Sequence, residues 1–431
     1  MRETFYERIG ESCQREKLGN GLTVCVVPKP GYRRKYAFFA ARYGGMDTRF
    51  CLDGTWRDTP AGIAHYLEHK MFDTKDGSAM QDLAKNGAEP NAFTASSLTG
   101  YYFDCTEHFE ENLKILLRFV SVPYFTQESV DKERGIIAQE IRMVEDNPDW
   151  QIYQQLLQAL YVRHASRVPI AGTVESIAEI TPQTLYDCHK AFYTPANMVL
   201  TVVGDVRPDR VFEAAERILP AESGPDIERD YGDEPEAIHQ KEVTRHMEVS
   251  APQFLLGFKC PPPERGESGY RTELLGDLAW DILLGESSPL YQRLYENGTI
   301  NGSFGGAFDT LPGAACLYAG GDCREPRKVA EAILRETERL QTDGIDPDYW
   351  QRMRRAAFGS TLRGLNSFEN IAVGLAEGCF QGYDAFRFPR VYESIQPEDV
   401  LAFLRQNVRE ERMALSRILP GQEQEKEGTD A

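Results

Sequence analysis

Long apolar runs are absent from this sequence, in which no stretch of roughly 18 or more apolar residues occurs. The first residues, Met1 to Arg8, also lack the apolar segment of a secretion signal. Because a membrane-spanning helix needs about 20 predominantly apolar residues, we expect neither a membrane span nor export.

Paired cysteines are also missing. The nine cysteines stand singly, and none has the C-x-x-C spacing of a zinc or redox motif. Cys25, Cys105 and Cys260 lie within strand-like apolar runs, which favours buried free thiols over disulfides or metal ligands. Such cysteine usage is typical of a reducing compartment, and we predict a cytoplasmic protein.

Basic residues are outnumbered, with 48 Lys and Arg against 67 Asp and Glu and a formal net charge of −19. Nucleic acid is therefore not an expected partner, because its phosphates would be repelled. The hydrophobic content of 41% suffices for packed cores, and 431 residues exceed what one compact core usually holds. We expect two or three folded domains.

Histidine is scarce, with seven in the chain, yet two fall in one segment, Gly62-Ile-Ala-His65-Tyr-Leu-Glu68-His69-Lys-Met-Phe72. The run lacks internal glycine and proline and predicts a helix on which His65, Glu68 and His69 share one face. The order H-x-x-E-H is that of an inverted zinc-binding helix, with Glu68 placed to take a proton from water at the open position of the metal. The alternative is two surface or capping histidines beside a solvated glutamate.

A catalytic zinc site needs a third protein ligand, and the helix predicted at 125–146 offers two candidates. Glu133 and Glu140 fall inside the apolar arc of that helix, which Ile136 and Val144 bracket. A buried carboxylate needs a partner, and a metal ion together with the ring N–H of a ligating histidine would supply both. The alternative is a pair of structural glutamates that form salt bridges with nearby arginines, namely Arg134 or Arg142.

The predicted elements follow a similar order in two halves. Residues 1–220 contain expected strands at 17–28, 35–43, 91–95, 100–105 and 198–204, and expected helices at 62–72, 78–86, 107–119, 125–146, 150–162, 181–193 and 208–218. Residues 242–420 contain expected strands at 243–260 and 302–318, and expected helices at 270–284, 290–296, 326–342, 346–364 and 368–380. Residues 221–241 are acidic and contain Pro and Gly, which predicts a linker, and residues 421–431 are polar enough to predict a disordered tail.

Four segments together resemble the pitrilysin/insulinase family of zinc metallopeptidases. They are His65-Tyr-Leu-Glu68-His69, Pro90-Asn91-Ala92-Phe93-Thr94, Tyr101-Tyr-Phe and Glu133-Arg-Gly-Ile-Ile-Ala-Gln-Glu140. Glu140 follows His69 by 71 residues, as the family pattern requires. The likeness is greatest to a bacterial YmfH-type subgroup, and the chain is similar in size to a subunit of mitochondrial processing peptidase.

The resemblance implies an α+β fold of two similar domains, each a mostly antiparallel sheet with helices packed on one side, which together form half of a clamshell. Residues 1–220 would be the zinc-binding catalytic domain, and residues 242–420 a similar domain without metal. It also implies that Zn²⁺ is bound by His65, His69 and Glu140, although Mn²⁺ or Co²⁺ suits the same ligands.

The remaining roles also come from the resemblance. Glu68 matches the general base, and Glu133 matches the carboxylate that supports a ligating histidine. Asn91, Ala92 and Phe93 match the edge strand along which family members bind a peptide substrate as an added strand, with loose sequence preference. The alternative for these three residues is an ordinary edge strand.

One part of the family pattern is missing. Active members use an Arg and a Tyr from the second half to stabilise the developing oxyanion. Here Tyr295 stands at the Arg position and Asn301 or Gly302 at the Tyr position, while Arg293 lies two positions too early.

We therefore expect a zinc-dependent endopeptidase subunit that hydrolyses peptides or small unfolded proteins in a closed chamber. A homologous partner chain would supply the missing pair in a heterodimer. A homodimer is the less favoured alternative, because both of its copies would lack the pair. The alternative is a non-catalytic peptide-binding or scaffold subunit.

Overall fold

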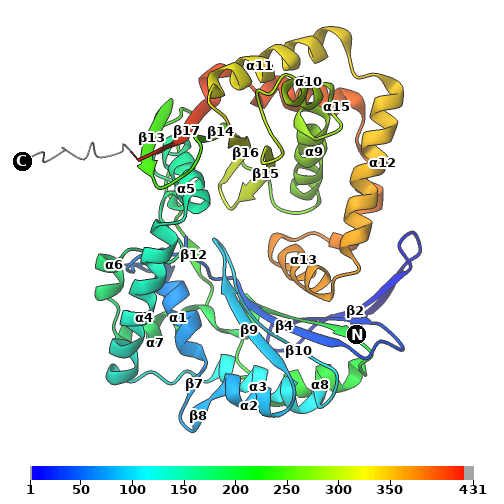
Figure 1. Cartoon of the computed structure of the whole chain (residues 1–431). Coiled ribbons are helices and arrows are strands. Elements are labelled where there is room, and N and C mark those ends of the chain that lie inside the picture. The colour runs from blue at the N-terminus through cyan, green and yellow to red at the C-terminus, as the bar shows by residue number, and fades with distance from the viewer. Residues whose placement is uncertain (1, 422–431) are drawn as a thin grey trace, which may run out of the picture.

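The computed structural model describes residues 2–421, which form two sheets flanked by helices (Figure 1). The expected disordered tail at 421–431 lies outside the described residues except for Gly421. The predicted boundaries at 220, 221–241 and 242 remain a prediction, although each large sheet draws its strands from one side of that region.

The first sheet has seven strands in the order β1-β2-β3-β11-β4-β10-β9. All neighbours are antiparallel except β3 and β11, which run parallel. In the order of the sheet, the strands span Arg2–Tyr6, Glu11–Lys17, Thr23–Pro28, Met198–Gly204, Lys35–Ala41, Thr99–Cys105 and Glu89–Thr94. The central position of β11 explains its strongly apolar sequence, because all seven of its residues are buried.

The second sheet has five strands in the order β13-β17-β14-β16-β15. In that order they span Glu242–Met247, Met413–Pro420, Gln253–Cys260, Ala314–Asp322 and Gly305–Leu311. Only β13 and β17 pair in parallel. The order and the parallel pair reproduce β3-β11-β4-β10-β9 of the first sheet, so the repeat expected from the sequence is a repeat of topology.

Helices of each half cover one face of the sheet of that half. On the first sheet these are α1 Ile63–Met71, α2 Ala79–Lys85, α3 Phe109–Ser121, α4 Gln127–Glu145, α7 Pro182–Phe192 and α8 Pro208–Ile218. On the second they are α9 Glu267–Leu284, α10 Pro289–Glu296, α11 Pro326–Asp343, α12 Pro347–Gly364, α14 Phe388–Ser394 and α15 Pro397–Asn407. The smaller elements are α6 Val174–Ala178, a three-stranded sheet of β12 Glu228–Arg229, β5 Arg49–Leu52 and β6 Thr55–Asp58, and the pair β7 Asp73–Thr74 and β8 Gly77–Ser78.

Each sheet receives one helix from the other half on its remaining face. Helix α5 (Pro148–Leu160) packs on β14 and β17 of the second sheet, and α13 (Phe368–Gln381) packs on β4 and β11 of the first (Figure 1). Gly257 in β14 allows the close approach of α5, because a Cβ atom there would lie 2.8 Å from the side chain of Leu156. This reciprocal exchange of helices fixes the two halves to each other.

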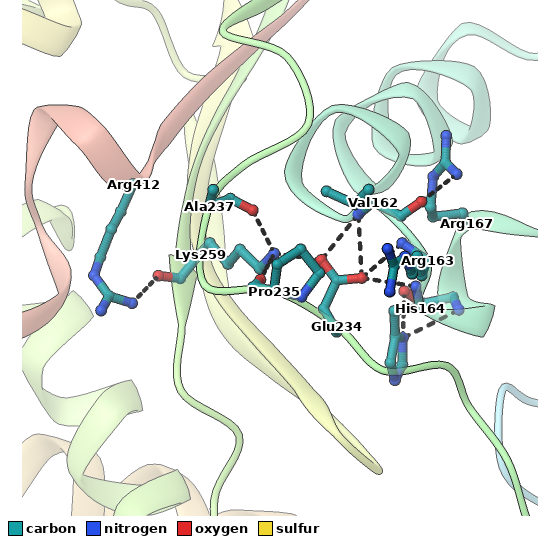
Figure 2. A network of polar contacts seen from close by, with 10 residues as sticks. Val162, Arg163, His164, Arg167, Glu234, Pro235, Ala237, Lys259 and Arg412 are labelled. Carbon is teal, nitrogen blue, oxygen red and sulfur yellow. Dashed lines mark hydrogen bonds and ion pairs between the residues drawn. The ribbon is translucent and has the colours of Figure 1, made fainter.

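A buried polar network strengthens the same connection within the predicted linker (Figure 2). Both carboxylate oxygens of Glu234 accept hydrogen bonds from Val162 N, and one also accepts from Arg163 N and His164 N, just after α5. Lys259 of β14 forms an ion pair with Glu234 and donates to two linker carbonyl oxygens, those of Pro235 and Ala237. This part of the linker is therefore held firmly between the halves.

Several short strands were not expected from the sequence. The hairpin of β1 and β2 is rich in charged residues, and its outer strand packs little of its surface, so it lacks the apolar alternation of a typical strand. The hairpin is instead held by contacts with the second half, including a hydrogen bond of 2.7 Å from the Tyr6 hydroxyl to Asp384. Strand β17 was also missed, although its first residues are apolar.

Candidate metal centre

Helix α1 is buried along almost its whole length and begins at a tight approach between segments. Gly62 precedes it with φ +90°, and a Cβ atom there would lie 2.4 Å from the carbonyl oxygen of Ala171. Glycine is therefore required where the chain enters the helix. His65 and Glu68 are both buried although polar, so their side chains need partners inside the fold.

Helix α4 supplies those partners and has a well-defined start. Thr126 and Ser129 form a reciprocal capping box at its N-terminus. The Tyr66 hydroxyl of α1 donates a hydrogen bond to the carbonyl oxygen of Val130, which ties the two helices together one turn into α4. Glu133 and Glu140 therefore face α1 from fixed positions.

The two histidines and Glu140 converge on one point. His65 Nε2 lies 3.5 Å from one carboxylate oxygen of Glu140, and His69 Nε2 lies 3.4 Å from the other. One ligand atom from each of the three residues lies within 4.8 Å of the others, and no other such group occurs among residues 2–421. Two atoms bound to one zinc ion at about 2.0–2.1 Å in tetrahedral geometry lie about 3.3–3.4 Å apart, so this donor set fits a zinc ion.

Glu133 holds the other ring nitrogen of His69. Its carboxylate lies 3.0 Å from His69 Nδ1, and the buried ammonium group of Lys70 lies 3.9 Å from its second oxygen. Burial is the largest single influence on the pKa of His69 and lowers it, but the hydrogen bond with Glu133 and the negative charges of Glu68, Glu140 and Glu133 together raise it overall. The same hydrogen bond lowers the pKa of Glu133, so Glu133 is an ionised acceptor that orients the ring and leaves Nε2 toward Glu140.

Glu68 lies beside this group without belonging to it. Thr94 Oγ1 donates a hydrogen bond of 3.1 Å to one of its oxygens. Burial raises the pKa of Glu68, whereas the facing His65 ring lowers that of Glu140. The two carboxylates thus have different proton affinities, as a base and a metal ligand require.

Strand β9 brings the predicted substrate segment next to this centre. It forms one edge of the first sheet and contacts α1. Asn91 is exposed, and Ala92 and Phe93 are half-buried, with the Phe93 ring stacked on Phe38 at 5.8 Å between centroids. Thr94 connects this strand to Glu68, so the expected edge position is present, and its use by a peptide remains a prediction.

The structure changes three details of the sequence argument. Ile136, expected in the apolar arc of α4, has a side chain that is 48% exposed. Arg134, an alternative partner for the glutamates, forms an ion pair with Asp131 instead. Thr94 and Lys70 were not anticipated as partners, although Thr94 closes the quoted Pro90-to-Thr94 segment and Lys70 follows His69 directly.

The region of the missing Arg and Tyr lies in and after α10. Arg293 forms an ion pair with Glu336. Tyr295 is exposed, and Asn301 donates a hydrogen bond of 3.2 Å to Asp322. None of these contacts involves the candidate metal centre in the first half.

Family profiles and relatives agree with this geometry. The profile described as insulinase (peptidase family M16) matches residues 54–174, and that described as peptidase M16 inactive domain matches residues 179–357. A Bacillus subtilis (strain 168) protein named uncharacterized zinc protease YmfH is 38% identical over 96% of this chain and 98% of its own length. The chain belongs to peptidase family M16.

Solved structures give the same result for the fold of this M16 chain. An M16-like peptidase from Alicyclobacillus acidocaldarius has a TM-score of 0.91 and 32% identity, with 95% of this chain and 99% of that chain covered. A protease from Helicobacter pylori shares the fold with a TM-score of 0.80 at 20% identity, over 95% of this chain and 99% of its own. The family, the YmfH-type likeness and the two-domain α+β fold expected from the sequence are confirmed.

The described part of the M16 chain contains no helix whose length and apolar character would allow it to cross a membrane.

Proposed function

We propose that this M16 chain is the zinc-binding and base-carrying subunit of a metalloendopeptidase. The observation that supports this most is the convergence of His65, His69 and Glu140 on one point, with buried Glu68 beside them. The name of the Bacillus subtilis relative, a zinc protease, agrees with the proposal.

Each residue of the site has a separate role in the proposed reaction. A zinc ion bound by His65, His69 and Glu140 would supply Lewis-acid chemistry at this position. Glu68 accepts a proton from the attacking water and later donates it to the leaving amine. Thr94 holds the Glu68 carboxylate in place, and Glu133 keeps the His69 ring in one orientation.

The substrate in this proposal is an extended peptide added to the free edge of β9, with Asn91, Ala92 and Phe93 alongside it. Main-chain hydrogen bonds would hold such a strand, so peptides and small unfolded proteins of varied sequence would serve. The chamber closes only when a homologous partner chain docks and supplies the missing pair, an Arg where this chain has Tyr295 and a Tyr where it has Asn301 or Gly302. The nine free cysteines agree with a cytoplasmic location.

The test combines one variant with one partner. The purified chain with one equivalent of zinc should show negligible peptidase activity, and adding a homologous chain that carries the Arg/Tyr pair should restore it. In that mixture Glu68→Gln should keep the zinc and lose about 10²–10⁴-fold in kcat, because it removes the proton transfer. The matched control is Glu145→Gln, an exposed carboxylate on α4, which should match the wild-type chain.

Two outcomes would contradict the proposal. Full turnover by the chain alone would remove the need for a partner, and undiminished turnover by Glu68→Gln would exclude Glu68 as the base.

The second candidate function is a non-catalytic peptide-binding or scaffold subunit. The observation that favours it is that Arg293, which lies two residues before the expected Arg position, forms an ion pair with Glu336. This candidate predicts peptide binding without turnover, whether or not zinc and a partner chain are present.

A further inference from the structure

Two thiols from opposite halves of the chain meet on the face of the first sheet that is remote from the metal centre. Cys25 Sγ of β3 lies 3.8 Å from Cys379 Sγ near the end of α13. Along β3, Val24 and Val26 pack toward the helices of the first half, whereas Cys25 faces α13. The pair therefore belongs to the contact between the halves and has no role in the proposed catalysis.

A cleft gives solvent access to this pair. It has a volume of about 530 Å³ and lies between the β1–β2 hairpin and the end of α13, with Cys13 and Cys379 in its wall. Cys379 is partly exposed, whereas Cys25 is fully buried behind it. A small oxidant can therefore reach Cys379 first, with Cys25 in contact behind it.

The guanidinium group of Arg15 lies in the same cleft. Its Nη2 atom is buried without a hydrogen-bond partner, and its closest acid, Asp384, is 3.9 Å away. An unsatisfied cationic donor beside thiols favours negative charge on sulfur or oxygen there.

We propose that Cys25 and Cys379 are a reversible oxidation site, at which a peroxide converts the two thiols into a disulfide that joins β3 to α13. The sulfur atoms need to approach each other by about 1.8 Å to reach the bond length of a disulfide, about 2 Å.

The reaction balances with hydrogen peroxide as the oxidant. The Cys379 thiolate attacks one peroxide oxygen, the O–O bond breaks, and a sulfenic acid and hydroxide form. Cys25, as thiolate, then attacks the Cys379 sulfur, the S–O bond breaks, and a second hydroxide leaves. The two thiol protons convert both hydroxides to water, so two thiols and one peroxide give one disulfide and two waters.

The surroundings make this a slow reaction. The hydrogen bond with Cys25 and burial raise the pKa of Cys379, so little thiolate is present at neutral pH. The pair therefore stays reduced until oxidant is in sustained excess. A thiol reductant reverses the bond by exchange.

The disulfide would connect residues 354 positions apart, one in each half. A cross-link over such a long loop restricts the unfolded chain strongly, so the oxidised form should unfold at a temperature several degrees higher. It would also prevent α13 from moving away from the first sheet.

The experiment treats the full-length reduced chain with hydrogen peroxide, quenches it, and counts thiols under denaturing conditions before mapping cross-linked peptides by mass spectrometry. The expected result is two fewer thiols than the nine of the sequence, a peptide pair joined through Cys25 and Cys379, and recovery with dithiothreitol. The variant Cys379→Ser should show neither the cross-link nor the rise in unfolding temperature. Cys105→Ser, which alters a buried thiol of another core cluster, should behave as the wild type.

Three results would overturn the proposal: nine unmodified thiols, a main product that joins Cys13 to Cys25, or oxidation of Cys379 to sulfinic acid without a cross-link. If the oxidised wild-type chain unfolded at the same temperature as the reduced chain, the claim that a disulfide joins the two halves would be contradicted. None of these readouts depends on peptidase activity, so the outcome is independent of the proposed function.

Discussion

Glu133 determines which nitrogen of His69 faces the metal position. A carboxylate at 3.0 Å from Nδ1 fixes the proton on that nitrogen and leaves Nε2 as the donor toward Glu140. His65 has no such support, because its Nδ1 is buried without a hydrogen-bond partner among the described residues. A hydrogen bond to the second ring nitrogen therefore orients His69 but not His65.

Removing the charge of Glu133 should therefore weaken metal binding without abolishing it. For Glu133→Gln we expect zinc affinity to fall about 10- to 100-fold, because His69 becomes less basic and less well oriented. Competition with a zinc-binding dye measures the change, with Glu145→Gln on the same helix as the control. Unchanged affinity in Glu133→Gln would show that the hydrogen bond does not support the site.

Most residues of this site could be predicted from the sequence, because helical spacing determines which side chains share a face. Spacing of three and four residues puts His65, Glu68 and His69 on one face of α1, and the family pattern identified Glu140. The roles of Thr94 and Lys70 could not be predicted. Thr94 contacts Glu68 and Lys70 contacts Glu133, over separations of 26 and 63 residues, and local periodicity gives no information about contacts at such separations.

Among the elements, α9 carries an acidic stripe that periodicity alone does not explain. Glu273 and Asp277 lie one turn apart and are half-buried. Burial, reinforced by Asp277, raises the pKa of Glu273 to about 8. Burial, reinforced by Asp281, raises the pKa of Asp277 to about 7. In the unfolded chain both groups ionise near pH 4.

The pH dependence of stability follows from these shifts. Between about pH 4 and 8 the folded chain retains protons that the unfolded chain has released, so rising pH lowers the free energy of unfolding. The Asp277→Asn variant has no titrating carboxyl group at that position. Its urea midpoint of unfolding should therefore fall less than that of the wild type as the pH rises from about 4 to 8. Urea unfolding at several pH values measures this effect.

The control for this prediction is Glu338→Gln, an exposed carboxylate on α11, which should follow the wild-type curve. Parallel curves for Asp277→Asn and the wild type would show that Asp277 does not titrate abnormally.

Most of the helices were predictable within a few residues, because caps and turns mark their ends, but α6, α14 and α15 were not expected from the sequence. Helix α4 was expected at 125–146 and spans Gln127–Glu145, after the capping residue Thr126. The exposure of Ile136 was not predictable, since one arc of a helical wheel does not reveal how much of it a neighbouring element covers. For the same reason, the sequence did not predict that α5 packs on the second sheet and α13 on the first, because this packing depends on contacts between distant segments.

At the scale of the whole molecule, the junction between the halves rests on Lys259 and Glu234. Their side chains are only 6% and 9% exposed, and both also bind backbone groups. A buried charge that loses its partner costs several kcal/mol. The sequence suggested only a linker at this position, because a single lysine in a strand gives no sign of its partner.

Lys259→Met should therefore lower the free energy of unfolding by about 3–5 kcal/mol, because Glu234 is left as a buried carboxylate without its cation. The control is Lys328→Met, which removes an exposed ion pair with Glu325 and should leave the free energy of unfolding nearly unchanged. Denaturant unfolding measures both variants, and equal losses would show that the junction is not stabilised by this pair.

The central claim is that α1 and α4 together form one zinc site, and zinc stoichiometry tests it most directly. We expect the metal-free chain to take up one zinc per chain in an equilibrium titration. Glu140→Gln, which alters the ligand from α4 alone, should reduce that binding strongly, and Glu145→Gln should leave it unchanged. A wild-type chain that binds no zinc, or a Glu140→Gln variant that binds it as tightly, would contradict the account.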